Sequence, residues 1–146
     1  MDFKLDDKVA LVTASTGGIG LGIARVLAQE KATVIVNGRA ADSVSRACEK
    51  IKSANPGAKL QQLVADNGTA AGCEKTITTY PDVDILVNSL GIYESIDFFD
   101  CTDSQWQHLF EVNILSGLRL GRYYLKRMLK RKDATIRKKG LLYLPS

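Results

Sequence analysis

The stretch TASTGGIG, residues 13–20, decides the fold because of what lies on either side of it. The four residues before it, VALV at 9–12, form an apolar run typical of a buried strand, and apolar residues follow it at helical spacing from Ile19 to Leu27. A glycine-rich turn from strand to helix lets the backbone approach a pyrophosphate and directs free N–H groups at it. The stretch therefore predicts a dinucleotide-binding turn, and a tight turn with packing glycines is the alternative.

Outward from this turn, apolar runs alternate with segments of helical period. Further strands are expected at residues 34–36, 60–65, 85–87 and 140–144. Helices are expected around Val44 to Ile51, around Cys73 to Tyr80, and from about Ser104 to Arg131, the last opening on the capping box Thr102-x-x-Gln105. The alternation predicts an α/β fold of the Rossmann type, a doubly wound parallel sheet of about five strands. Residues 1–146 are expected to form one dinucleotide-binding domain, itself incomplete.

Charge and cysteine content narrow the classes of partner and the compartment. Residues 126–139 hold eight basic residues and one acid, a net charge of +7, so the remainder carries −3 of the overall +4. We interpret this segment as a solvated helix end and expect no nucleic acid or membrane partner, because no aromatic residue is interleaved through it. Three scattered cysteines indicate reduced thiols and no metal site. With no signal peptide and no apolar run long enough to span a bilayer, the chain is expected in the cytoplasm.

These features resemble the short-chain dehydrogenase/reductase family, whose fingerprint is T-G-x-x-x-G-x-G. The chain matches it at Thr13, Gly18 and Gly20, and has Ala14 where the family has its first glycine. The resemblance covers essentially the whole chain, and residues 97–128 look most like reductases of the 3-oxoacyl carrier-protein type. It implies the strand order 3-2-1-4-5, and it implies that the family's C-terminal strands and helices are absent here.

Three further landmarks of the family follow in order. Asp66 comes just after the third strand, Asn88 and Gly91 frame the turn after the fourth, and Asn113 lies within the long helix. Together with the fingerprint they imply a set of cofactor-binding residues. The set is Thr13, Ser15, Thr16, Gly18, Ile19, Gly20, Arg39, Asp66, Asn67, Asn88 and Gly91.

Cofactor preference follows from the end of the second strand, which reads Val36-Asn37-Gly38-Arg39. Folds that prefer NAD(H) carry a carboxylate there to bind the ribose hydroxyls. No acid stands at this point to repel a 2′-phosphate, and Arg39 can pair with one through a forked, charge-assisted contact. We therefore expect NADP(H), with NAD(H) as the alternative in which Arg39 is a solvated loop residue.

The resemblance implies hydride transfer between the nicotinamide and a small carbonyl or alcohol substrate. In the family a Tyr transfers the proton, a Lys four residues later assists it, and a Ser and an Asn complete the site. Here Asn113 and Ser146 are the predicted catalytic residues, and the chain ends before the Tyr-x-x-x-Lys motif. Neither Tyr123, followed by Arg127, nor the single histidine, His108, is expected to replace it.

The expected function is thus an NADP(H)-dependent oxidoreductase whose activity is impaired in this chain. The alternative is a non-catalytic module that binds a dinucleotide or mediates oligomerisation. An uncovered fifth strand and an uncovered face of the long helix would both favour self-association, so a homo-oligomer is expected.

Overall fold

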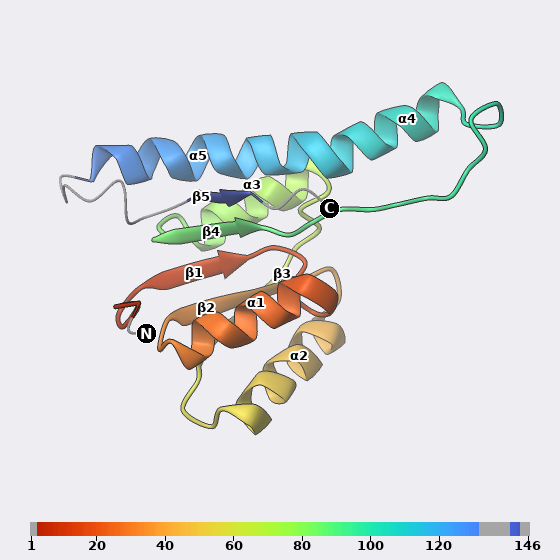
Figure 1. The fold of residues 1–146 in the computed structure, drawn as a ribbon. Helices are drawn as coiled ribbons and strands as arrows, with labels where there is room; N and C mark the ends of the chain where they lie inside the picture. Colours follow the sequence, from red (N-terminus) through yellow and green to blue (C-terminus); the bar gives the residue numbers. More distant parts are fainter. Residues whose placement is uncertain (1–2, 132–140, 144–146) are drawn as a thin grey trace.

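The computed structural model describes residues 3–131 and 141–143. Strands and helices alternate along the chain, and the strands pair in parallel in the order β3-β2-β1-β4-β5 (Figure 1). The Rossmann-type doubly wound sheet predicted from the sequence is therefore confirmed. The strands are β1 (Val9–Val12), β2 (Thr33–Gly38), β3 (Lys59–Val64), β4 (Ile85–Asn88) and β5 (Leu141–Tyr143).

Helices cover both faces of the sheet. On one face lie α1 (Gly18–Gln29) and α2 (Ala41–Ala54), and on the other lie α3 (Ala70–Thr79), α4 (Asp103–Phe110) and α5 (Ser116–Lys130) (Figure 1). Each central strand sends alternate side chains to the two layers, because successive residues of a strand point to opposite faces. Leu11 packs with Tyr124 of α5, whereas its neighbour Val12 packs with Ala24 of α1. Because both faces of β1 and β2 are covered by helices, the sequences of these two strands are almost continuously apolar.

The sequence predicts one continuous helix from about Ser104 to Arg131. In the structure this helix is interrupted by an irregular turn. Between α4 and α5, residues Glu111–Leu115 form one turn of π-helix (η1), which adds a residue to that turn. Asn113 lies at its centre. The expected capping box is present, since Gln105 N–H donates to Thr102 Oγ1 and Thr102 N–H donates to Gln105 Oε1.

One strand, β3, lies at the edge of the sheet, as the predicted strand order implies. β3 pairs only with β2 among the described strands, and Lys59, Gln61 and Gln62 are exposed on it. Within the described residues, no helix is both long and apolar enough to cross a membrane.

Candidate functional site

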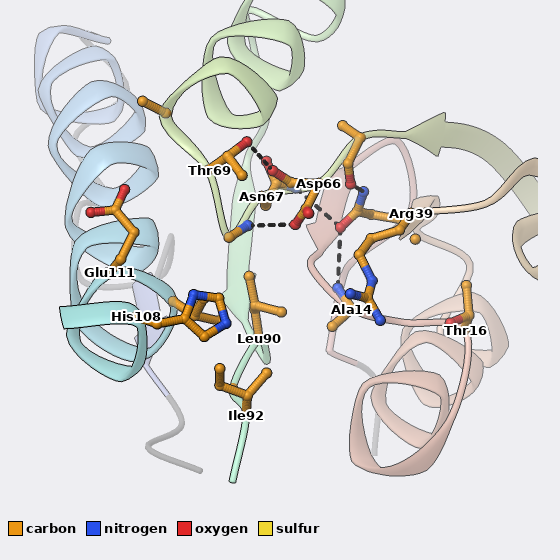
Figure 2. Close-up of a pocket in the computed structure, with 17 residues that line it drawn as sticks. Ala14, Thr16, Arg39, Asp66, Asn67, Thr69, Leu90, Ile92, His108 and Glu111 are labelled. Atoms are coloured by element: carbon orange, nitrogen blue, oxygen red, sulfur yellow. Dashed lines mark hydrogen bonds between the residues drawn. The ribbon is translucent and has the colours of Figure 1, made fainter. Parts of the chain in front are cut away.

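An open cleft of about 390 Å³ lies at the carboxyl ends of the strands (Figure 2). Parallel strands bring their carboxyl ends to one edge of the sheet, where ligands of doubly wound folds bind. The turn after β1, the end of β2, the segment after β3, the segment after β4 and the long helix all contribute walls. The lining residues are Ala14, Thr16, Asn37, Gly38, Arg39, Ala65, Asp66, Asn67, Gly68, Thr69, Ala70, Leu90, Gly91, Ile92, His108, Glu111 and Val112.

The glycine-rich turn brings the start of α1 close to the end of β1. A Cβ added to Gly20 would lie 2.5 Å from Ala14 O, so only glycine lets α1 begin this close to β1. Gly18 has φ +52°, in the left-handed region. Ala14 has φ +49°, where a side chain is disfavoured, so the turn keeps the conformation that glycine would adopt freely and stores strain there.

The first turn of α1 suits an anion. Its N-cap is Gly17, which has no side chain with which to cap the helix, and the described first turn contains no acid. By contrast, α3 and α4 begin with Thr69 and Thr102, whose hydroxyls accept from backbone N–H groups. The N–H groups and positive dipole end of α1 are thus left for a ligand, and the residues present fit a bound pyrophosphate.

A buried amide, that of Asn37, connects three walls of the cleft. Asn37 Nδ2 donates to Leu63 O (3.1 Å) and Ala65 O (3.0 Å) at the end of β3. Its Oδ1 accepts from Ala14 N–H (3.1 Å) and from Asn67 Nδ2 (3.0 Å). With four hydrogen bonds and 2% exposure, this side chain fixes the turn after β1 relative to β3.

Three predicted cofactor residues use their side chains inside the protein. Ser15 Oγ donates to Val12 O (2.8 Å) and accepts from Asn37 N–H (2.9 Å). Thr13 Oγ1 accepts from Ser89 N–H (2.9 Å), which ties the ends of β1 and β4 together. The side chain of Asn88 is buried as well. Their geometry holds the turns in place, and any contact with a cofactor would come from their backbone.

Four other predicted residues do line the cleft with reachable groups. Arg39 is exposed at the end of β2, and Thr16 lies across from it on the turn after β1 (Figure 2). Asp66 is exposed after β3, where its Oδ1 accepts from Gly68 N–H (3.0 Å), and Gly91 lines the opposite wall. Asn67 lines the cleft as well, but its side chain is buried and its amide bonds to Asn37 and Thr76, while Ile19 is exposed outside the cleft.

Asn113 holds the segment after β4 against the long helix. Its Oδ1 accepts from Ile92 N–H (2.7 Å), and its Nδ2 donates to Ile92 O (3.0 Å). Both functions of the amide are therefore used on one backbone residue that itself lines the cleft. Ser146, the other predicted catalytic residue, lies outside the described residues.

Sequence reasoning missed the wall that the long helix contributes. His108, Glu111 and Val112 line the cleft from α4 and η1, and His108 projects from α4 toward Leu90 in Figure 2. The sequence gave little indication of these three residues. Fourteen residues separate β4 from α4, so the sequence does not show which face of the helix lies against the cleft. Among the described residues, no group of His, Cys, Asp or Glu could hold a metal ion.

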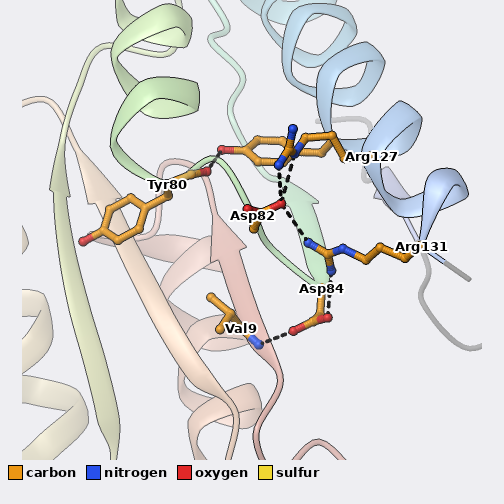
Figure 3. A network of polar contacts seen from close by, with 7 residues as sticks. Val9, Tyr80, Asp82, Asp84, Arg127 and Arg131 are labelled. Carbon is orange, nitrogen blue, oxygen red and sulfur yellow. Dashed lines mark hydrogen bonds and ion pairs between the residues drawn. The ribbon is translucent and has the colours of Figure 1, made fainter. Parts of the chain in front are cut away.

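The basic segment is not simply a solvated helix end. Arg127 donates to Asp82 Oδ1 through Nε (3.0 Å) and Nη2 (2.7 Å), and Arg131 donates to Asp84 Oδ1 (3.0 Å) (Figure 3). Asp84 also accepts from Val9 N–H (3.0 Å). Two of the eight basic residues thus fasten the end of α5 to the amino ends of β1 and β4; residues 132–139 lie outside the described part of the chain.

The buried side chains of Tyr124 and Cys73, on α5 and α3, stay protonated near neutral pH. Tyr124 donates its hydroxyl proton to Tyr80 O (2.7 Å), and burial raises the pKa of its phenol. Burial also raises the pKa of Cys73 to about 11, so its thiol stays protonated near neutral pH. Tyr123 packs under Arg127, whose guanidinium carbon lies 5.5 Å from the ring centroid, as a packing residue would.

Comparison with known proteins identifies relatives along most of the chain. The family model described as short chain dehydrogenase matches residues 8–137. The oxidoreductase YvaG of Bacillus subtilis (strain 168), itself uncharacterized, is 46% identical over 136 residues, covering 93% of this chain and 52% of YvaG. D-beta-hydroxybutyrate dehydrogenase of Cupriavidus necator is 36% identical, covering 88% of this chain and 50% of that protein.

Solved structures give the same result. The structure of L-sorbose reductase from Gluconobacter frateurii, in complex with NADPH and L-sorbose, has a TM-score of 0.79 at 29% identity, covering 88% of this chain and 50% of that one. A structure described provisionally as a betaketoacyl-ACP reductase has a TM-score of 0.77 at 38% identity, covering 87% and 51%. The chain spans about half the length of the relatives it matches.

Proposed function

The chain belongs to the short-chain dehydrogenase family, and from this premise we propose that residues 1–146 are part of the NADP(H)-binding domain of a cytoplasmic oxidoreductase. Its reaction would be hydride transfer between the nicotinamide and a small carbonyl or alcohol substrate. The observation that carries the proposal is the cleft itself, with exposed Arg39 at one wall and, at another, Thr16 on the turn that leads into the uncapped start of α1.

Three parts of the dinucleotide have a matching group in or beside this cleft. The N–H groups at the start of α1 would bind the pyrophosphate. The guanidinium of Arg39 and the hydroxyl of Thr16 would bind the 2′-phosphate, and the carboxylate of Asp66 would accept from the adenine amino group. NADP(H), when bound, supplies or accepts the hydride.

The chain contributes part of the proton-transfer machinery by resemblance. Asn113 holds the backbone of Ile92, so we assign it a positioning role at the cleft. A reduced carbonyl develops negative charge on oxygen and needs a proton donor there. No tyrosine of the 146 residues is followed four positions later by lysine, so we propose that this chain alone binds cofactor and turns over little.

Titration of the 146-residue chain with NADPH, followed by the fluorescence of the reduced nicotinamide, tests the proposal. Binding of NADPH is expected, with no NADPH oxidation when a keto substrate such as L-sorbose or acetoacetate is added. Arg39→Asp should weaken NADPH binding by at least about tenfold and shift preference toward NADH. A chain that bound neither dinucleotide would contradict the proposal.

A second candidate, a self-associating module, is favoured by one observation. Several apolar side chains are exposed along the long helix: Trp106, Phe110, Ile114, Leu118, Leu125 and Leu129. A row of this kind marks an interaction surface, and a homo-oligomer would bury it. Light scattering across a range of protein concentrations would detect the association, and a monomer at all concentrations would contradict it.

A further inference from the structure

The helix α3 packs directly on the segment that follows β3. A Cβ added to Gly72 would overlap with Asp66 O, so only glycine lets the first turn of α3 come this close to that backbone. One residue later, the thiol of Cys73 donates to Asn67 O (3.2 Å). Because Asp66 and Asn67 both line the cleft, the position of α3 is part of the geometry of the cleft.

Thr76 is a fully buried polar residue on α3 and does not itself line the cleft. Its hydroxyl oxygen lies 2.6 Å from Asn67 Oδ1 and 3.0 Å from Gly72 O. The hydroxyl carries one proton and both neighbours are acceptors, so the shorter distance assigns the proton to Asn67. Thr76 therefore connects the body of α3 to the amide of Asn67.

Two buried amides, those of Asn67 and Asn37, continue from this bond to the glycine-rich turn. Asn67 Nδ2 donates to Asn37 Oδ1 (3.0 Å), and the same oxygen accepts from Ala14 N–H (3.1 Å) (Figure 2). Asn37 Nδ2 donates to the carbonyls of Leu63 and Ala65. A continuous series of hydrogen bonds thus joins α3 to the turn after β1.

The hydroxyl of Thr76 sets the direction of this series. Because it donates to Asn67 Oδ1, the Nδ2 of Asn67 is the group left to face Asn37. Without the hydroxyl, Asn67 Oδ1 would be a buried acceptor lacking its donor, and a flipped amide would bring two acceptor oxygens together. Both asparagines are 2% exposed, so water does not readily replace the lost partner. The loss should therefore be transmitted to the Ala14 N–H.

We propose that Thr76 is a positioning residue for dinucleotide binding, which acts through Asn67 and Asn37 on the backbone of the glycine-rich turn at Ala14. The helix α3 thereby holds two walls of the cleft, the segment at Asp66 by direct packing and the turn by the two buried amides. The proposal rests on the proposed function, since the ligand that is positioned is the dinucleotide.

Thr76→Val tests the role directly, because it removes the hydroxyl and keeps the shape of the side chain. In the 146-residue chain labelled with nitrogen-15 and free of ligand, the backbone amide signal of Ala14 should move relative to wild type. The dissociation constant for NADPH, measured by nucleotide fluorescence, should rise about fivefold. Thr76→Ala removes the same hydroxyl and should give both effects. Thr76→Ser retains it and should return the Ala14 signal to its wild-type position and the NADPH affinity to within about twofold of wild type.

Two control variants separate this role from a general loss of stability. Tyr124→Phe removes another buried hydroxyl, which donates to Tyr80 O on the other side of α3 from the two amides. Thr79→Val makes the same substitution at an exposed position of α3, where the hydroxyl donates to Lys75 O. Neither variant should move the Ala14 signal or change the NADPH affinity beyond about twofold.

The outcomes distinguish this proposal from the proposed function. An Ala14 signal that stays in place in Thr76→Val would overturn the positioning role, and so would an NADPH affinity that stays unchanged while the signal moves. A loss of affinity that Thr76→Ser does not recover, or that Tyr124→Phe shares, would overturn it as well. Wild type that binds neither dinucleotide would overturn the proposed function, whereas the Ala14 signal, measured without ligand, would still show whether α3 holds the turn.

Discussion

At the amino ends of the strands, charged side chains pair with one another, whereas at the carboxyl ends polar groups face an open cleft. Asp82 and Asp84 pair with Arg127 and Arg131 and fasten α5 to the sheet (Figure 3). At the other end, α1 begins without a side-chain cap and Arg39 is exposed (Figure 2). At one end of the sheet the charged groups thus pair within the protein, and at the other end polar groups stay available to a ligand.

The contrast shows how the fold separates stability from binding. Every buried side-chain nitrogen and oxygen of the described residues has a hydrogen-bond partner. The buried amides beneath the cleft therefore bond within the protein, and the groups left for a ligand are the backbone at a helix start and exposed side chains. Changes at the amino end should alter the free energy of unfolding alone, and changes at the carboxyl end should alter it together with cofactor affinity.

The largest effect is expected from Asn37→Ala, beneath the cleft. It would leave two carbonyls and two N–H donors without their partner, and should lower the free energy of unfolding by about 3 to 5 kcal/mol. Urea denaturation measures this. Asn55→Ala, which removes a single bond to Ala28 O, is the matched control and should cost about 1 kcal/mol. Equal losses for the two variants would show that Asn37 does not connect the walls.

A smaller effect is expected from Asp84→Ala, at the amino end. This side chain accepts from Val9 N–H and Arg131 and is 19% exposed, so its loss should lower the free energy of unfolding by about 2 kcal/mol. Affinity for NADPH, measured by fluorescence titration, should not change. If the folded variant bound NADPH more weakly than wild type, the amino end of the sheet would also affect cofactor binding, contrary to this prediction.

Ala14→Gly should act in the opposite direction. Glycine adopts φ near +49° without a steric penalty, although it also makes the unfolded chain more flexible. The balance should stabilise the protein by about 0.5 kcal/mol, and Ala14→Val should destabilise it. Denaturant midpoints of both variants measure the difference, and a gain for valine would show that the turn is not strained.

The smallest effect is expected from the titration of Asp82. Hydrogen bonds from Arg127 and then Arg131, against some desolvation, hold the pKa of this exposed carboxyl below its usual value. Because its folded-state pKa is the lower one, the carboxylate stabilises the protein above pH about 3.9 and loses this contribution as pH falls through the folded-state pKa. The urea midpoints of wild type and Asp82→Asn should therefore converge as pH is lowered from 6 toward 3. A gap that widened on acidification would contradict the ion pair.

The sequence predicted the fold well because its evidence is local. Strand periodicity, the turn at 13–20 and the capping box at Thr102 each depend on neighbouring residues, and each is confirmed. The site was predicted less completely because it is assembled from five segments. Arg39 and Asp66 follow strands directly, so their place at the cleft could be predicted. His108 and the inward orientation of Asn37 depend on packing between distant elements, and the bond from Thr76 to Asn67 depends on how α3 packs against the segment after β3.

Two other differences have the same origin. The π-helical turn at Glu111–Leu115 could not be predicted from the sequence. One extra residue in a turn shifts the spacing of apolar residues only locally, so the segment has the pattern of an ordinary amphipathic helix. The pairing of Arg127 with Asp82 joins residues 45 positions apart, so no local sequence pattern indicates it and the sequence alone predicts a solvated arginine.

The contact between Asn113 and Ile92 has a consequence for solvent exchange. The side-chain amide of Asn113 offers one acceptor and one donor to the N–H and C=O of the same residue, as a neighbouring strand would. Ile92 lies in a stretch without helix or strand, yet its amide hydrogen is bonded as in a sheet ladder. That hydrogen should exchange with deuterium more slowly than those of Tyr93 and Glu94 beside it, which gives a single reporter for whether the long helix stays docked at the cleft.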